Sequence, residues 1–489
     1  MHQRIVGLET EFGCFVRDRH AGTPEKVVEA VKDHAFYQKK LGLIDLHARN
    51  YAFEPARAGG FLVNGGRLYV DAVGSHEEYA TAECVDLHDL VAHDRAGHRI
   101  LTGLLDDMGL SDSVSFHNNS VDHFAGHTFG CHENYLVDLE MDGFMESLSL
   151  LMPFLVTRQI FAGVGRVGGH RINHNDLRNS VMTLGEHEVD YIWVSNVYGV
   201  EIDRSVDYQL SQRADHILRA VSSRVRFNRA IINPKWETYY TFNNLHRLHV
   251  LYGEANMSEY ATFLKVGTTS AVLELIESKR IPESLRLRDP VAALKSISRD
   301  PSYRWQVRLQ DGKTMGAIDL QRIYLSAAKK HLSRKDRQTD EVLAEWERVL
   351  DALERDPMEL ADCLDWVAKK QLFEEYRSSE GVSWQDDMMQ SLDMEYHNIN
   401  PDQGLFYGLQ DAGAIRRITT DEQIEEATRM PPGNTRARGR SQAIRRLLSS
   451  GVRPYMLDWD GIHVGKDRHL PLSNPFKTYQ GEVSALLGS

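Results

Sequence analysis

The sequence predicts an α+β fold, with a largely antiparallel sheet in a large domain and a small C-terminal domain. Short alternating strands such as Phe61–Val63 are separated by turns rich in glycine and asparagine throughout the first half of the chain. Long helical patterns follow between about Asp319 and Arg377. The breaker Pro431–Gly433 then precedes a compact tail with one strand-like segment, Tyr455–Trp459.

A chain of 489 residues is too long to fold around one ordinary hydrophobic core, so two or three folding units are expected. We expect a catalytic domain over residues 1–425, with an insertion at about 168–205, and a small domain over 426–489. The net charge of −13 disfavours a nucleic-acid partner. Four cysteines without paired spacing predict a reducing, cytoplasmic location.

The start of the sequence does not resemble a signal peptide. The most apolar run, Leu148–Val156, is broken by Pro153 and is too short for a membrane span. We therefore expect no membrane partner. Helical spacing marks Leu87–Leu105 and Ser270–Ile276 as helices. The clearest apolar stripe predicts core packing rather than a cofactor site; its members are Val342, Leu343, Trp346, Val349, Leu350 and Leu353.

The strongest functional signal is the segment Ile5–Gly13, which reads as a strand. Strand side chains alternate between the two faces, so Glu9 and Glu11 share one face, beside the open space left by Gly7. Neighbouring carboxylates repel each other unless a positive group lies between them. A single strand of this kind is more often an amphipathic strand with a solvated polar face.

A second strand, Gly66–Asp71, adds a further acidic group and an arginine. Arg67, Tyr69 and Asp71 share one of its faces, and aliphatic residues occupy the other. Mg²⁺ prefers oxygen ligands and is commonly shared with substrate phosphates. The two strands together therefore favour a nucleotide–metal site over two solvated polar faces.

The run Gly74–Glu83 follows at once and adds groups to the same pocket. Glu78 and Glu83 offer carboxylates, and the Thr81 hydroxyl can bond a phosphate or a ribose. Strict alternation would place Glu78 and Thr81 on opposite faces, so a bend or bulge is expected between them.

Two other patterns admit a site. A zinc site in the His-rich stretch is conceivable but matches no usual ligand spacing, so a hydrogen-bonding loop is favoured; its candidate ligands are His123, His127, Cys131 and His132. Arginines of the tail form a basic strip, usually a solvated helix face, that could also meet an acidic partner or phosphates: Arg436, Arg438, Arg440, Arg445, Arg446 and Arg453. Trp459 can stack on a purine, although a tryptophan in an apolar strand is more often core.

With these residues in view, the chain resembles the Pup–protein ligase and depupylase family. The resemblance runs nearly from end to end. Its matching segments are Gly7–Gly13, Asn64–Asp71, Gly74–Glu83, Gly130–Tyr135, Phe154–Gln159, Ser211–Ala214, Arg247–Val250, Asn256–Glu259, Leu264–Thr268, Asp365–Val367 and Thr435–Ala437.

The resemblance implies a carboxylate–amine ligase fold related to glutamine synthetase, with ATP and Mg²⁺ on the concave face of the sheet. It implies that ATP phosphorylates the terminal glutamate side chain of a small disordered Pup-like modifier, which is then joined to lysines of substrate proteins, with an indirect link to a bacterial proteasome. The implied roles are metal ligation by Glu9, Tyr69 and Glu78, nucleotide binding by Arg67, Thr81 and Trp459, and catalysis by Asp71 as the base.

Within the family, Phe12, Ser75–His76 and Thr435–Arg438 resemble the ligase. The longer segment before Arg67, which includes Tyr51–Gly59, resembles the depupylase, which would cleave the isopeptide or deamidate the modifier in the same pocket. The insertion at 168–205 and the sequence at 234–240 depart from both branches and point to a Pup-like relative as the modifier. Two further hypotheses are a small-molecule glutamate–amine ligase and a non-catalytic modifier-binding protein.

Overall fold

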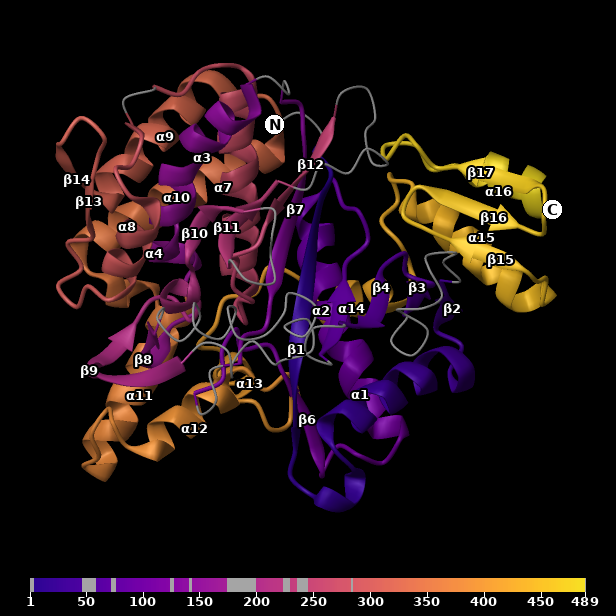
Figure 1. Ribbon diagram of the computed structural model, residues 1–489, viewed down its shortest axis with the longest axis horizontal. Helices are drawn as coiled ribbons and strands as arrows, with labels where there is room; N and C mark the ends of the chain where they lie inside the picture. The colour runs from indigo at the N-terminus through magenta and orange to yellow at the C-terminus, as the bar shows by residue number, and fades with distance from the viewer. Residues whose placement is uncertain are drawn as a thin grey trace, which may run out of the picture.

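The computed structural model describes residues 4–45, 59–71, 76–123, 127–139, 143–173, 199–222, 229–234, 245–282 and 285–488. In these residues the main sheet has ten strands in the order β10-β11-β12-β7-β1-β5-β4-β3-β2, with β6 paired to the far end of β1 (Figure 1). Its strands are β1 Val6–Val16, β2 Gly42–Ile44, β3 Gly60–Leu62, β4 Arg67–Val70, β5 Glu77–Ala80, β6 Val114–His117, β7 Cys131–Val137, β10 Arg219–Val221, β11 Ala230–Asn233 and β12 His246–Val250.

The pairing is antiparallel throughout this sheet except between β10 and β11, as the sequence predicted for an α+β fold. A separate hairpin is formed by β8, Arg166–Asn173, and β9, Gly199–Gln209. Most of these two strands belongs to the predicted insertion at about 168–205, and its residues 174–198 lie outside the described residues. The depupylase-like segment 51–59 and the stretch 234–240 likewise fall almost wholly outside them.

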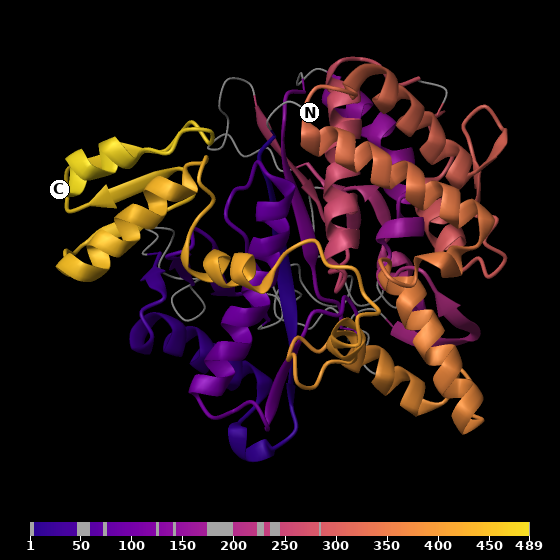
Figure 2. The same ribbon diagram turned by 180° about the vertical axis from the view of Figure 1, so that it is seen from behind.

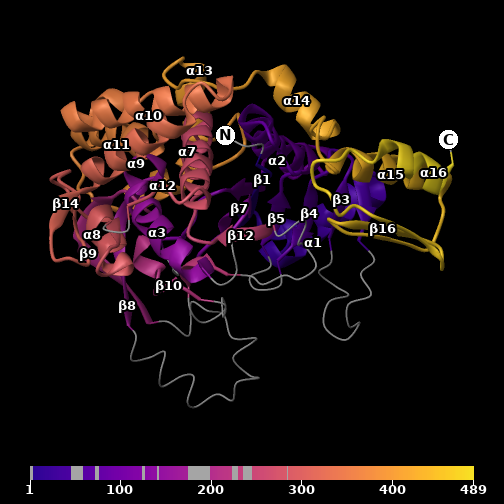
Figure 3. The ribbon, with the colours of Figure 1, turned by 90° about the horizontal axis from the view of Figure 1, so that it is seen from above.

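Helices pack on one face of the sheet, and Figure 3 shows α2, α7, α10 and α14 above the strands. The buried side of β1, with Val6 and Leu8, joins a continuous apolar core with the helices behind it. The helices are α1 Pro24–Asp33, α2 Leu87–Asp107, α3 Phe144–Thr157, α4 Gln159–Ala162, α7 Glu259–Glu277, α8 Pro290–Ser298, α9 Ala317–Leu332, α10 Arg337–Arg355, α11 Asp365–Glu380, α12 Asp387–Tyr396, α13 Leu405–Asp411 and α14 Asp421–Arg429. None of the described helices is long and apolar enough to cross a membrane.

The long helices follow the predicted periodicity. The helix α10 begins at the N-cap Asp336, whose side chain accepts a hydrogen bond from the Thr339 amide, and its predicted apolar stripe is buried as expected. The predicted helix at Ser270–Ile276 is the C-terminal part of a longer one, α7. Because α7 is buried almost all round, its sequence lacks the amphipathic pattern that would have revealed its first turns.

The C-terminal part forms a small sheet and two helices beside the β2–β3 edge of the main sheet (Figure 1). It contains α15 Ala437–Ser450, β15 Tyr455–Leu457, β16 Gly461–Val464, β17 Arg468–Pro471 and α16 Gln480–Leu487. Its apolar core includes Leu43 and Phe61 from the main sheet. The expected boundary at 425/426 falls inside α14, which packs against α2, and Figure 2 shows α14 in front of α2. We propose a boundary after α14, at residues 430–436.

A buried ion-pair cluster holds the C-terminal part against the sheet. Glu83 follows β5 and accepts hydrogen bonds from Arg436, at 2.8 Å, and from Arg440, whose side chain is fully buried. Burial opposes ionisation of Glu83, but the two guanidinium groups outweigh it and lower the pKa of Glu83 to about 2. Part of the predicted basic strip is therefore a structural contact rather than a solvated helix face.

Replacement of Arg440 with methionine tests this contact. The substitution leaves Glu83 buried with one cationic partner, so we expect Arg440→Met to lower the free energy of unfolding by about 3 kcal/mol. Arg438→Met is the matched control, because Arg438 lies on the same helix and its side chain has no ion pair in the described structure. Urea denaturation measures both variants, and equal midpoints would contradict the structural role of Arg440.

Candidate active site

The candidate active site lies on the sheet face opposite the helices, where strand register brings together side chains that are distant in sequence. Glu9 on β1 stands opposite His132 on β7 and Ala80 on β5, and Ala80 stands opposite Arg67 on β4. Directly opposed residues of paired strands point to the same face. Arg67, Glu9 and His132 therefore belong to one row that crosses the sheet.

A second row lies one step further along the strands. Glu11 on β1 stands opposite Glu78 on β5, which in turn stands opposite Tyr69 on β4. The predicted metal ligands Glu9, Tyr69 and Glu78 thus come from three adjacent strands of one face. The sequence prediction that both strands present their polar groups on a common face agrees with this register.

Glu9 has three basic neighbours. Its carboxylate lies 3.3 Å from His132 Nδ1, 3.6 Å from His249 Nε2 and 3.4 Å from Arg247 Nη1. Burial disfavours the carboxylate form, but these groups outweigh burial and hold the pKa of Glu9 well below its usual range. The ligand atoms of Glu9, His132 and His249 lie within 4.8 Å of one another, a spacing that suits a metal ion.

Glu11 belongs to a second compact group, with Asp71 and His76, whose ligand atoms also lie within 4.8 Å of one another. Glu11 Oε2 accepts a hydrogen bond from the Gly130 amide at 2.6 Å and lies 3.2 Å from His76 Nδ1. Burial is again outweighed, and the pKa of Glu11 falls to about 2. Asp71, the predicted base, follows β4 directly and is half-buried.

Glu78 contrasts with these two carboxylates. It is 4% exposed, and burial together with the charges of Glu11, Glu9 and Asp71 raises its pKa well above the usual value. The same burial and the carboxylates of Glu78 and Glu9 raise the pKa of Tyr69. The positive side chains nearby therefore do not offset the negative charge around Glu78 and Tyr69.

Carboxylate and phenolic oxygen atoms on one sheet face suit a divalent cation, although Glu78 belongs to neither compact group of ligand residues in the described part of the chain. Glu9, Tyr69 and Glu78 remain the proposed ligands, and the structure adds His132 and His249 beside Glu9. From the sequence alone, His132 is a candidate ligand only for zinc, and His249 has no assigned role. The alternation of Arg247 and His249 on one strand was the available signal, because both lie on the site face.

A bulge places Thr81 beside Glu9. Glu9 pairs with Ala80, and Val6 pairs with Cys84. The four residue steps from Ala80 to Cys84 therefore stand opposite only three steps on β1, which is the mark of a bulge. Thr81 Oγ1 accepts a hydrogen bond from the Leu8 amide at 3.1 Å and faces the space above Gly7, whose added Cβ would meet it at 3.4 Å. The irregularity expected from the sequence is therefore present at this point of the strand.

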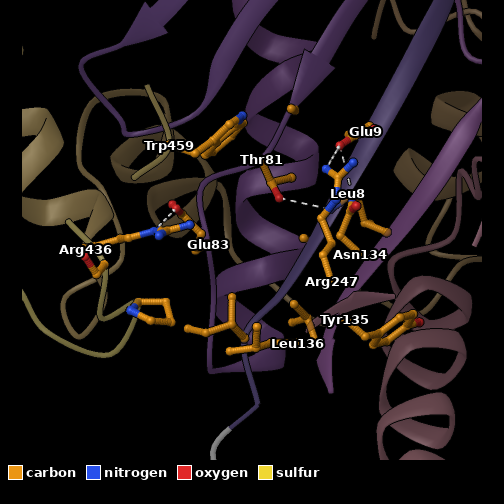
Figure 4. Close-up of a pocket in the computed structure, with 16 residues that line it drawn as sticks. Leu8, Glu9, Thr81, Glu83, Asn134, Tyr135, Leu136, Arg247, Arg436 and Trp459 are labelled. Atoms are coloured by element: carbon orange, nitrogen blue, oxygen red, sulfur yellow. Dashed lines mark hydrogen bonds and ion pairs between the residues drawn. The ribbon is translucent and has the colours of Figure 1, made fainter. Parts of the chain in front are cut away.

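A pocket opens between this face and the C-terminal part (Figure 4). The pocket and its open mouth together hold about 740 Å³ of space between atoms, part of which is solvent at the mouth. Its walls are apolar near Leu136, Trp459 and Pro475 and polar near Glu9, Thr81, Asn134 and Arg247. Trp459 lies just after β15, outside the predicted strand, and is half-buried at the pocket wall, where it packs against the apolar core of the C-terminal part.

Arg67 differs from the other two predicted nucleotide residues, because it lies one strand beyond the pocket lining. Its Nε and Nη2 donate to Asp45 Oδ2 at 2.8 and 2.5 Å, and its guanidinium lies 4.3 Å from the centre of the Tyr69 ring. The sequence motifs did not reveal Asp45. Its ion pair with Arg67 depends on the order of the strands, in which β3 lies between β2 and β4.

The zinc alternative finds no support in the described residues. His123 lies 3.0 Å from Asp393, whereas Cys131 pairs with Thr10 and His132 with Glu9. Among the described His, Cys, Asp and Glu residues, the compact groups are those centred on Glu9 and Glu11.

Comparison with known proteins agrees with this geometry. The family model described as Pup-ligase protein matches residues 4–463. Two curated proteins named Pup--protein ligase, from Nocardioides sp. and Nocardia farcinica, are each 35% identical to the chain; the alignments cover all of this chain, with 99% and 100% of the relatives. The chain belongs to the Pup-ligase family.

Solved structures extend this result to the fold. The complex of the prokaryotic ubiquitin-like protein Pup and its ligase PafA matches with a TM-score of 0.79 and 30% identity, over 99% of this chain and 92% of that one. The Pup ligase PafA in complex with ADP matches with a TM-score of 0.74 and 35% identity, over 87% and 89%. The predicted family and α+β ligase fold are confirmed.

The excess of carboxylates around Glu78 predicts that Mg²⁺ alone, without nucleotide, binds at this site and stabilises the protein. We expect saturating Mg²⁺ to stabilise the wild-type protein by about 1–3 kcal/mol relative to EDTA, because the cation binds only the folded carboxylate row. Glu78→Gln removes a ligand charge and should lose most of this shift in a thermal melt. Glu422→Gln, an exposed change on α14, is the control. Equal shifts in all three proteins would exclude Glu78 from the metal site.

Proposed function

We propose that the protein is an ATP- and Mg²⁺-dependent ligase that joins a small Pup-like modifier to lysines of other proteins. The observation that carries the proposal is the coincidence of a pocket beside the sheet with two compact carboxylate-containing groups at the same face, in a chain of the Pup-ligase family. The solved relatives hold Pup in one structure and ADP in another, which supports both substrates.

The pocket gives each part of the nucleotide a chemically matched environment. The purine would lie against Trp459 and Leu136, with the ribose or phosphates bonded by the Thr81 hydroxyl. Arg247 and Arg67 supply positive charge for the phosphates. Glu9, Tyr69 and Glu78 would hold Mg²⁺, which when bound neutralises charge on the phosphates.

The reaction then proceeds in two balanced steps. A carboxylate oxygen of the modifier's terminal glutamate attacks the γ-phosphorus of ATP, the bond to ADP breaks, and an acyl phosphate forms. A lysine amine next attacks the acyl carbon, phosphate leaves, and an isopeptide bond remains. Asp71 is the proposed base that takes the ammonium proton, since a protonated amine has no lone pair for attack.

The acidic groups around Asp71 also favour lysine as the acceptor. Glu11 is ionised next to Asp71, so the site attracts an ammonium group before chemistry begins. We further propose that the reaction is cytoplasmic, where ATP is abundant, and that conjugates pass to a bacterial proteasome. A depupylase or deamidase would use the same pocket with water as the acceptor, and the relatives compared above are ligases.

Incubation with ATP, Mg²⁺, a Pup-like peptide ending in glutamate and a lysine-bearing protein should yield a conjugate, detected by a mass shift. Release of modifier from a preformed conjugate, without conjugate formation, would favour the hydrolase instead. A peptide ending in alanine is the negative control, because it lacks the side-chain carboxylate that accepts the phosphoryl group.

Asp71→Asn tests the base directly. The amide cannot accept the lysine proton, so we expect turnover to fall by about 10²–10⁴-fold while ADP affinity stays within about twofold. Turnover is measured by conjugate formation and affinity by calorimetry. Parallel loss of ADP binding would instead make Asp71 a residue of the metal or nucleotide site.

A further inference from the structure

Asp45 lies directly after β2, where the sheet edge meets the C-terminal part. Its side chain is completely buried, and its Oδ2 accepts both the Nε and the Nη2 hydrogen bonds of Arg67. Its backbone amide donates to the Gly59 carbonyl at 3.1 Å. Asp45 is therefore held by the strand on one side and by Arg67 on the other.

Arg67 is fixed in a defined orientation by these contacts. Its guanidinium lies 4.3 Å from the centre of the Tyr69 ring and 5.9 Å from that of Phe61. Its two bonds to Asp45 use Nε and Nη2, and Nη1 has no protein partner among the described residues. The Nη1 group of a rigid, charged guanidinium is thus left to bind a ligand.

The Arg67 guanidinium lies between Phe61 and Tyr69, which mark the two ends of the proposed nucleotide site. Phe61 packs edge-on against Trp459, with ring centres 5.0 Å apart, on the side of the base. On the side of the proposed metal site, Tyr69 stands opposite Glu78. A phosphate chain that joins the base to the metal would pass between these two ends, beside Arg67.

We propose that Asp45 is a positioning residue for nucleotide binding, which fixes the Arg67 guanidinium so that Nη1 meets the phosphates. The inference rests on the proposed function, since it assigns Asp45 to the same nucleotide site. An unrestrained arginine loses rotamer freedom when it binds a phosphate, whereas Arg67 is already ordered by Asp45. Asp45 contributes through Arg67 and touches neither substrate nor metal.

Two substitutions separate the charge of Asp45 from its shape. Asp45→Asn keeps the volume and one acceptor, and Asp45→Ala removes both. We expect the Kd for MgADP, measured by calorimetry, to rise about threefold in Asp45→Asn and about tenfold in Asp45→Ala. At saturating ATP, kcat should remain within about twofold of wild type, because only binding of the nucleotide is impaired. An unchanged or lower Kd in Asp45→Ala would overturn the proposal.

A double-mutant cycle distinguishes positioning from a structural role. In an Arg67→Met background, Asp45→Asn should raise the Kd no further, because the group that Asp45 orients is gone. The same added loss of affinity with and without Arg67 would overturn the proposal.

Asp203→Asn is the matched control, since Asp203 is also buried and paired with two arginines, Arg171 and Arg299, at the β8–β9 hairpin. It should lower the melting temperature and leave the Kd for MgADP unchanged, and a Kd that rose as in Asp45→Asn would overturn the specific role of Asp45. Wild-type protein that binds no MgADP would overturn the proposed function itself, whereas wild-type binding with unaltered Asp45 variants overturns only the positioning role.

Discussion

Carboxylates buried together on one sheet face impose the main constraint on this structure. Each must be offset by a cation, a hydrogen-bond donor or a proton, because an uncompensated buried charge is strongly unfavourable. Glu9 is offset by His132, His249 and Arg247, and Glu11 by a backbone amide and His76. Glu78 interacts with Arg67, but burial and the neighbouring carboxylates outweigh that charge, and the raised pKa of Glu78 marks the place where an external cation would be most effective.

The same constraint explains how the two parts of the chain share one pocket. The carboxylate of Glu83 forms ion pairs with Arg436 and Arg440 of the C-terminal part. Arg440 also lies over the Trp459 ring, with 4.7 Å between the guanidinium carbon and the ring centre. The ion pair that attaches the C-terminal part therefore also fixes the wall against which the purine would lie.

Local periodicity predicted much of the fold and the acidic part of the site. Period-two alternation identified the polar face of β1 and β4, and its conflict at Glu78 and Thr81 correctly required a bulge. The partners of these groups were not predictable in the same way. His249 reaches Glu9 through the pairing of β12 with β7, and Asp45 reaches Arg67 across β3, and such contacts depend on strand order rather than on spacing.

Charge also explains why a ligase of this kind needs a base so close to its acidic groups. A field of carboxylates attracts a lysine ammonium but also raises its pKa, so the electrostatics that recruit the acceptor oppose its deprotonation. Glu11 cannot remove the proton efficiently, because its pKa of about 2 makes it a weak base. Asp71, half-buried at the end of β4 and beside Glu11, has the position to do so. We therefore propose that recruitment and deprotonation are divided between two neighbouring carboxylates, Glu11 and the half-buried Asp71.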